Sequence, residues 1–186
     1  ACPVPLAPLA DTHAHLLSFW GKDVPETLVR AKAAGVDLLV TMFDPIADKR
    51  SVTDYSDWLV REILPMRDIP QVKYLAGVHP YGAPDYTDDI HAQVVAALDD
   101  PLCVGIGEIG LDYYWDVSTK ATQEIMLRAQ LELALELNLP VIIHDREAHG
   151  DSLRIVCDYP GLRGVFHCFS GSVEIVSYTH LRAHET

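Results

Sequence analysis

The sequence is poor in cysteine and in basic residues, and it lacks a long apolar run. Its four cysteines include no Cys-x-x-Cys pair, so we expect reduced thiols in a cytoplasmic protein and no disulfide framework. No stretch approaches the roughly 18 consecutive apolar residues of a membrane-spanning helix, so we expect no membrane partner. Lysine and arginine number 14 against 27 aspartates and glutamates, for a net charge of −13. This balance argues against a broad basic face for nucleic acid but is compatible with a local one.

What the sequence does contain is a globular composition and a regular alternation of two patterns. Its 186 residues are 49% hydrophobic and 22% charged, which is typical of a folded domain. Short apolar runs rich in valine and isoleucine alternate with amphipathic stretches, and this predicts βα units around a parallel sheet. The predicted strands are Pro8–His13, Val36–Phe43, Val72–His79, Leu102–Glu108, Pro140–His144 and Gly164–His167. The predicted helices are Val24–Ala34, Thr53–Leu64, Thr87–Leu98, Ser118–Leu137 and Gly150–Tyr159. Periodicity leaves two architectures open, an open doubly wound sheet or part of a (β/α)₈ barrel.

Side chains that can bind metal lie at the ends of five of these six strands. His13 and His15 are separated by one residue, and in extended backbone that spacing directs both imidazoles to the same side. The other candidates are His79, Glu108, His144 and His167. The carboxyl ends of parallel strands share one face of the sheet, where α/β enzymes build their sites. A barrel brings these ends to one point, whereas an open sheet spreads them along a line, so the histidines and the glutamate favour the barrel.

The donor types narrow the choice of metal. Imidazole and carboxylate together suit Zn²⁺, Mn²⁺, Fe²⁺ or Co²⁺ better than Mg²⁺ or Ca²⁺, which prefer all-oxygen shells. An unpaired carboxylate in the apolar run Leu102–Glu108 would cost several kcal/mol, so we expect Glu108 to have a metal or another strong partner. A carboxylate can bridge two ions, and two ions about 3.5–4 Å apart can activate water and stabilise the attacking and leaving oxygens. Hydrolysis of a phosphoester or an amide is the natural use of such a site.

Five motifs carry a resemblance to a known family. They are Asp11-Thr12-His13-Ala14-His15, Gly77-Val78-His79-Pro80, Gly107-Glu108-Ile109-Gly110-Leu111-Asp112-Tyr113-Tyr114, His144-Asp145-Arg146 and His167-Cys168-Phe169-Ser170-Gly171. In this order the chain resembles the TatD family of metal-dependent deoxyribonucleases, from about Leu9 to Ser172. The resemblance implies a (β/α)₈ TIM barrel with two divalent metal ions (Zn, Mn, Mg, Fe or Co) and phosphodiester hydrolysis with DNA as the substrate. We infer no obligate protein partner.

The same resemblance assigns the metal ligands. It implies that the first ion is bound by His13 and His15, that both ions are bridged by Glu108, and that the second ion is bound by His144 and His167. The family's last ligand is an aspartate after the eighth strand, in a Thr-Asp-x-Pro-type motif that this sequence lacks.

The missing motif bears on where the barrel ends. We expect residues 1–176 to form a barrel truncated after about six βα units, from a natural protein roughly 70–90 residues longer. Residues 177–186 have no convincing helical face and resemble a non-native tail.

Three further residues have competing interpretations. Glu108 and His79 are the two candidate catalytic residues. His79 contacts the scissile phosphate or protonates a leaving group, or else it only bonds the loop begun by Pro80. Asp112 orients the site or binds substrate, or else it forms a turn. Asp11 is a structural cap or holds an imidazole from the outer shell, and we favour the outer-shell role.

Two features near the predicted mouth of the barrel concern the substrate. Arg146 either binds a phosphate oxygen with its planar fork or pairs with Asp145 or Glu147, and we favour the phosphate. The aromatic run Tyr113–Trp115 either stacks on bases or packs into the barrel mouth, and we favour packing.

The leading hypothesis is a TatD-type deoxyribonuclease. One alternative is another amidohydrolase-type reaction, on an amide, a lactone or an aminoacyl ester. Many such barrels bridge their metals with a modified lysine, whereas the run Leu102–Gly110 has Glu108 and no lysine. The other alternative is an inactive barrel fragment, because lost strands would expose sheet edges.

Overall fold

The computed structural model describes residues 7–17, 23–115 and 118–167. The described strands are β1 (Leu9–Ala14), β2 (Val36–Phe43), β3 (Gln71–Ala76), β4 (Cys103–Asp112), β5 (Val141–Arg146) and β6 (Gly164–His167). The α-helices are α1 (Val24–Ala33), α2 (Val52–Trp58), α3 (Asp88–Ala97), α4 (Lys120–Glu136) and α5 (His149–Cys157). A π-helical turn (Leu59–Ile63) continues α2, and a 3₁₀ helix (Pro80–Asp85) follows β3. Within these ranges, every helix is too short or too polar to cross a membrane. The predicted tail, residues 177–186, lies outside the described residues.

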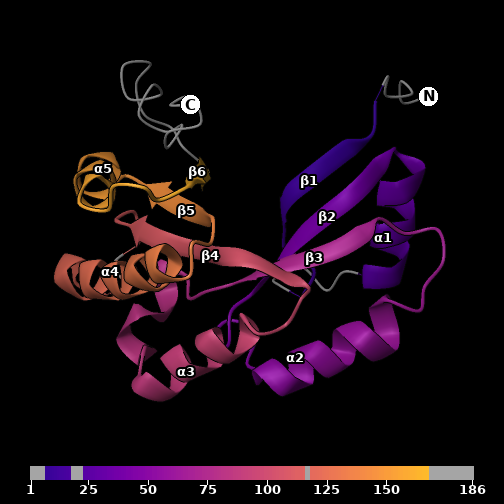
Figure 1. Ribbon diagram of the computed structural model, residues 1–186, viewed down its shortest axis with the longest axis horizontal. Helices are drawn as coiled ribbons and strands as arrows, with labels where there is room; N and C mark the ends of the chain where they lie inside the picture. Colours follow the sequence, from indigo (N-terminus) through magenta and orange to yellow (C-terminus); the bar gives the residue numbers. More distant parts are fainter. Residues whose placement is uncertain (1–6, 18–22, 116–117, 168–186) are drawn as a thin grey trace.

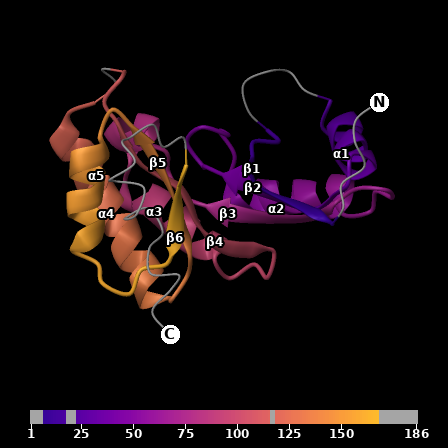
Figure 2. The same cartoon turned by 90° about the horizontal axis from the view of Figure 1, so that it is seen from above.

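The order of the strands decides between the two predicted architectures. All neighbouring strands pair in parallel, in the sequential order β1 to β6. A doubly wound sheet would reverse its order at a switch point. The sheet curls, and the helices lie along its outer side (Figures 1 and 2). The curl brings side chains of β1 and β6 together, since the rings of His13 and His167 stack with centroids 3.5 Å apart. The (β/α)₈ prediction is confirmed, and the described residues form six consecutive strands of that fold.

Side-chain caps start most of the helices where the sequence predicts them. Asp23 accepts the backbone N–H of Glu26 at 2.9 Å, and Ser51, Thr87 and Thr119 cap α2, α3 and α4 in the same way. The predicted helix over 53–64 differs from the structure. Its second half widens into the π-helical turn, which places Leu59 and Ile63 among the buried side chains.

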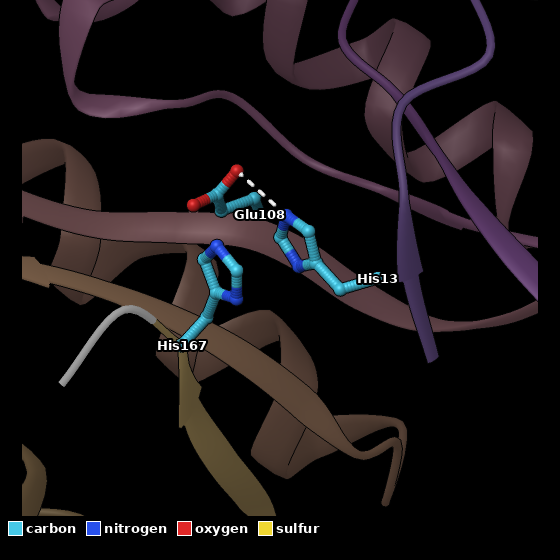
Figure 3. Close-up of side chains that lie close together, drawn as sticks. All are labelled: His13, Glu108 and His167. Atoms are coloured by element: carbon cyan, nitrogen blue, oxygen red, sulfur yellow. Dashed lines mark ion pairs between the residues drawn. The ribbon is translucent and has the colours of Figure 1, made fainter. Parts of the chain in front are cut away.

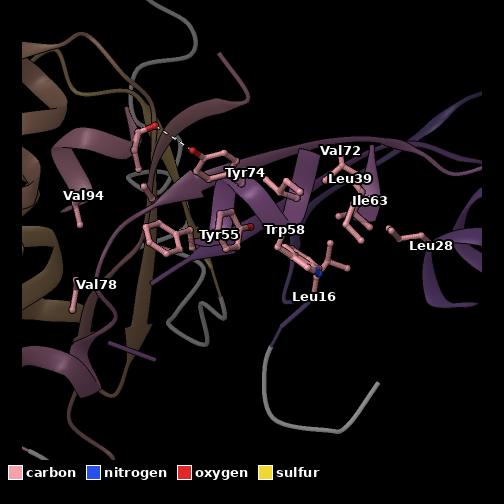
Figure 4. Close-up of a cluster of buried hydrophobic side chains, with 14 of the residues drawn as sticks. Leu16, Leu28, Leu39, Tyr55, Trp58, Ile63, Val72, Tyr74, Val78 and Val94 are labelled. Carbon is pink, nitrogen blue, oxygen red and sulfur yellow. Dashed lines mark hydrogen bonds between the residues drawn. The ribbon is translucent and has the colours of Figure 1, made fainter. Parts of the chain in front are cut away.

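The central strands β2–β5 are largely buried, as their valine- and isoleucine-rich sequences predict, whereas the edge strands β1 and β6 are partly exposed. The largest cluster lies between β1–β3 and the helices outside them and contains the aromatic side chains Phe43, Tyr55, Trp58 and Tyr74 (Figure 4). A second cluster joins β4 and β5 to α4 and α5. Four buried side chains form a third cluster between strands: Val40, Met42, Leu75 and Ile142. Most of the hydrophobic core therefore lies between the sheet and the helices that cover its outer face.

Strand β4 is longer than the sequence predicts and ends at Asp112, four residues after Glu108. Its pairing with β5 shifts register between Ile106 and Ile109. Gly110 then lies opposite His144 with a φ of +148°, and a Cβ at this position would overlap the His144 carbonyl oxygen. Glycine permits this close approach. Glu108 consequently projects from the middle of a strand rather than from its end.

Candidate metal centre

Glu108 is the residue on which the predicted ligands converge. Its side chain is 6% exposed. Its Oε2 lies 3.3 Å from the Nε2 of both His13 and His15, and its Oε1 lies 2.7 Å from the Nδ1 of His144. One buried carboxylate on β4 thus contacts three imidazoles that come from both halves of the sheet.

His13, His15 and Glu108 direct three ligand atoms to one point. The Nε2 atoms of the two histidines are 3.1 Å apart. Neighbouring ligand atoms around a tetrahedral Zn²⁺ are separated by about 3.3 Å, so this triangle has the size of one face of such a tetrahedron. The Nδ1 of His13 is buried and has no hydrogen-bond partner among the described residues. The donor types and their spacing fit a divalent ion.

His167 and His79 each belong to a group of possible ligand atoms, and the two groups share Glu108. His167 joins His13 and Glu108, and His79 joins Glu108 and His144; within each group the atoms lie within 4.8 Å of one another. Figure 3 shows His13 and His167 approaching Glu108 from β1 and β6. The His167 ring stacks on His13, whereas the family resemblance assigns it to the ion held by His144. All five predicted metal ligands therefore lie around one centre, and His79 lies with them.

The charges of the cluster follow from these contacts. Burial by itself would raise the pKa of the Glu108 carboxyl, but hydrogen bonds with His13, His144 and His15 outweigh burial and hold that pKa well below its usual range. Burial would lower the pKa of His144, but the contacts with Glu108 and Asp112 raise it instead. Burial and the neighbouring His13 lower the pKa of His167. Glu108 is therefore ionised at neutral pH, as a metal ligand must be.

Asp112 holds His144 from the side opposite Glu108. Its Oδ2 lies 3.1 Å from the Nε2 of His144, while the Nδ1 of that ring lies 2.7 Å from Glu108. A carboxylate on one ring nitrogen orients a ligating histidine and leaves the other nitrogen for the metal. The geometry is compatible both with orientation of the site and with the predicted turn, because the Oδ1 of Asp112 accepts the backbone N–H of Tyr114 at 2.9 Å. Asp11 caps the local backbone, the alternative to its favoured outer-shell role, because its Oδ1 accepts the backbone N–H of His13 at 3.1 Å.

A cleft with about 770 Å³ of empty space opens beside the cluster. The cluster contributes His15, His79 and Glu108 to its wall, and the remaining wall is formed by Met42, Asp44, Ile46, Ala47, Asp48, Tyr81 and Gly82. The candidate ligands are thus reachable by a molecule in this cleft.

Comparison with known proteins identifies the family. The profile described as TatD related DNase matches residues 10–182. The chain belongs to this family. The predicted resemblance is confirmed over nearly all of the described residues.

Two curated proteins illustrate the sequence similarity of this TatD family member to its relatives. The uncharacterized metal-dependent hydrolase YabD of Bacillus subtilis (strain 168) is 35% identical over 170 residues, which cover 90% of this chain and 63% of YabD. The 3'-5' ssDNA/RNA exonuclease TatD of Cronobacter turicensis is 34% identical over 154 residues, which cover 81% of this chain and 54% of that protein. The chain therefore spans somewhat more than half the length of these relatives.

Solved structures of the family have the same fold. YJJV, a TatD homologue from Escherichia coli K12, superposes with a TM-score of 0.72 at 26% identity, over 91% of this chain and 63% of that one. A TatD family hydrolase from Entamoeba histolytica superposes with a TM-score of 0.75 at 25% identity, over 92% of this chain and 61% of the other.

His79 lies at the start of the 3₁₀ helix, where its ring bonds the local loop as well as facing the cluster. Its Nδ1 accepts the backbone N–H of Tyr81 at 3.2 Å. Burial lowers the pKa of His79 to about 4, so the ring is neutral at pH 7 and carries its proton on Nε2. The two predicted interpretations of His79 are compatible, because the loop bond fixes the tautomer that makes Nε2 a donor.

Three buried polar residues of this TatD family member have roles that the sequence interpretation missed. Asp44 follows β2 and accepts the backbone N–H groups of His79, Ile46 and Ala47. Gln123 bonds both backbone groups of Asp112, and Gln130 bonds both backbone groups of Val78. Asp44, like the predicted site residues, is a polar residue at the carboxyl end of a strand. The two glutamines lie seven residues apart on one face of α4, which was the available signal.

Arg146 and the adjacent aromatic residues differ in part from expectation. Within the described chain, Arg146 forms no ion pair with Asp145, whose carboxylate instead contacts His149 and Ser152. The Arg146 guanidinium lies 3.9 Å above the ring of Tyr114. The packing prediction for the aromatic run is wrong for Tyr114 and Trp115, which are 49% and 50% exposed.

Proposed function

We propose that this chain is the metal-binding part of a TatD-type phosphodiesterase that hydrolyses DNA with two divalent ions. The observation that carries the proposal is the position of Glu108, a buried carboxylate with separate oxygens directed at His13 and His15 and at His144. A carboxylate with ligands on both sides is suited to bridge two ions. The names of the curated relatives, a metal-dependent hydrolase and 3'-5' ssDNA/RNA exonucleases, support both the metal and the substrate class.

The proposed ligands are those of the family resemblance. The first ion is held by His13, His15 and Glu108, and the second by Glu108, His144 and His167. Divalent ions at these side chains would supply the activation of a water molecule and the stabilisation of negative charge on phosphate oxygens.

The other side chains act on the substrate. His79 carries its proton on Nε2 and donates it in a hydrogen bond to a phosphate oxygen, because its Nδ1 is occupied by the Tyr81 backbone. Arg146 contributes positive charge at the mouth of the site, and Asp112 keeps His144 in orientation. We also propose a cytoplasmic location, which the free thiols of Cys103 and Cys157 support.

The proposal is tested by metal-dependent hydrolysis. The protein is stripped with EDTA, reloaded with Mn²⁺, Mg²⁺ or Zn²⁺, and incubated with single-stranded DNA, a small chromogenic phosphodiester, an amide and an aminoacyl ester. We expect the two phosphodiesters to be cleaved and the other two substrates to remain intact. Cleavage of the amide or the ester alone would replace this proposal with the amidohydrolase alternative, and cleavage of none with every ion would support an inactive fragment.

A further inference from the structure

Two large aromatic side chains are exposed beside the candidate metal centre. Tyr114 and Trp115 follow β4, and their rings contact each other edge to face, with centroids 4.7 Å apart. The guanidinium of Arg146, from the end of β5, lies 3.9 Å from the centroid of Tyr114 and 5.9 Å from that of Trp115. About half of each aromatic side chain is exposed to solvent. The proposed reaction does not use either ring.

These aromatic residues are held in register with the metal ligands through one carboxylate. The Oδ1 of Asp112 accepts the backbone N–H groups of Tyr114 and Trp115, at 2.9 and 3.4 Å. The other oxygen of the same carboxylate contacts His144 at 3.1 Å. Asp112 in β4 also lies opposite Arg146 in the register of the paired strands β4 and β5. A ligand bound on the aromatic pair would therefore have a defined position relative to the metal centre.

The side chains of Tyr114, Trp115 and Arg146 together favour a planar, anionic ligand. Exposed indole and phenol rings offer π-faces on which any nucleobase can stack, and the guanidinium attracts phosphate. The attraction matters here because the chain carries a net charge of −13 and would otherwise repel a polyanion. A base within a duplex is already stacked on its neighbours, so only an unpaired base can use these rings.

We propose that Tyr114, Trp115 and Arg146 form a stacking subsite for an unpaired nucleobase of the strand that enters the metal centre. This inference rests on the proposed phosphodiesterase function and assigns residues to the recognition of an unpaired strand. Stacking does not distinguish among the bases, so the subsite acts on strandedness and not on sequence.

The subsite is tested by binding, without turnover. A labelled oligothymidylate is titrated with the protein in EDTA, so that no cleavage occurs, and fluorescence anisotropy gives the affinity. Removing the indole by Trp115→Ala should weaken binding about 5- to 150-fold, the range expected for the loss of one stacked base. Trp115→Phe retains a ring and should restore most of the affinity. Val60→Ala, which shortens a 53%-exposed side chain beyond α2, is the control for loss of exposed apolar surface and should bind like the wild type.

Arg146 has a separate signature. Arg146→Gln should reduce the slope of log affinity against log salt concentration by about 0.7, the value for one phosphate contact on a single strand. A matching duplex should bind equally to the wild type and Trp115→Ala.

The outcomes separate the two proposals. Equal binding of oligothymidylate by the wild type and Trp115→Ala, or no binding by the wild type, overturns the subsite whatever the hydrolysis assays give. A Trp115→Ala defect together with no hydrolysis of any phosphodiester would leave the subsite standing and refute the proposed reaction. Equal weakening of single-strand and duplex binding would also contradict stacking on an unpaired base.

Discussion

The replacement of Glu108 by glutamine tests whether one carboxylate serves two ions. Glutamine has the shape of glutamate but no charge, and it loses one acceptor oxygen. In the wild type the carboxylate contacts His13, His15 and His144, so the change alters both sides of the cluster at once. An ion that binds only the folded protein stabilises it by about 2.7 kcal/mol at 100 times its dissociation constant. Two ions at such a concentration would therefore stabilise the wild type by about 5 kcal/mol.

The expected result is loss of nearly all this metal-dependent stabilisation in Glu108→Gln. In EDTA the variant should also be less stable than the wild type by about 3 kcal/mol, because a buried charged partner of three imidazoles has been removed. A domain stable by about 5–15 kcal/mol remains folded after such a loss. Phosphodiester hydrolysis should disappear at the same time.

The assay is urea unfolding followed by circular dichroism, in EDTA and in excess Mn²⁺ or Zn²⁺, with calorimetric titration to count the bound ions. His15→Asn is the matched control, because it removes a ligand from one side of the cluster only and should abolish one binding event of two. The reasoning is refuted if Glu108→Gln also loses only one event, since Glu108 would then belong to a single ion.

Three further predictions concern the frame around the site. Burial raises the pKa of Asp48 to about 6 from an ordinary value of 3.8, so the folded state favours the protonated acid and the wild type loses stability as pH rises between these values. In EDTA, Asp48→Asn should therefore be more stable than the wild type by about 2 kcal/mol at pH 7.5 and equal to it at pH 3.5, by urea unfolding. Gly110→Ala should lower the melting temperature by more than about 10 °C, because its Cβ would overlap the His144 carbonyl, whereas Gly150→Ala in α5 meets open space and should leave it unchanged or higher. Tyr74→Phe should cost about 1–2 kcal/mol in the same unfolding assay, because it removes hydrogen bonds of 3.2 and 3.1 Å to acceptors in α3 and the loop after it.

Much of the fold was predictable because the strands are short apolar runs separated by amphipathic stretches. Val36–Phe43 and Gly164–His167 have the predicted bounds, since continuous apolar runs leave few alternatives. The strand containing Glu108 was predicted too short for a physical reason. Its continuation depends on a register shift and on the close approach of Gly110 to β5, and both are tertiary effects without a local signal.

The candidate site was also predictable only in part. Residues of a single segment were recognised from spacing, as for His13 and His15, or from an unusual residue type, as for Glu108 in an apolar strand. Interactions between segments were not. The position of Arg146 over Tyr114 depends on the pairing of β4 with β5, which places one loop beside the other and competes successfully with the local ion pairs that the sequence suggests.

The candidate ligands also bear on the curvature of the sheet. In the described chain β1 and β6 share no backbone pairing, yet their side chains meet, because His13 stacks on His167 and contacts Glu108 on the strand between them. His13 contributes to the lowered pKa of His167. In the proposed site these two rings bind different ions, and Glu108 holds both ions from the strand between them. Metal binding would therefore favour the curvature of the sheet, because that curvature brings the proposed ligands of both ions together.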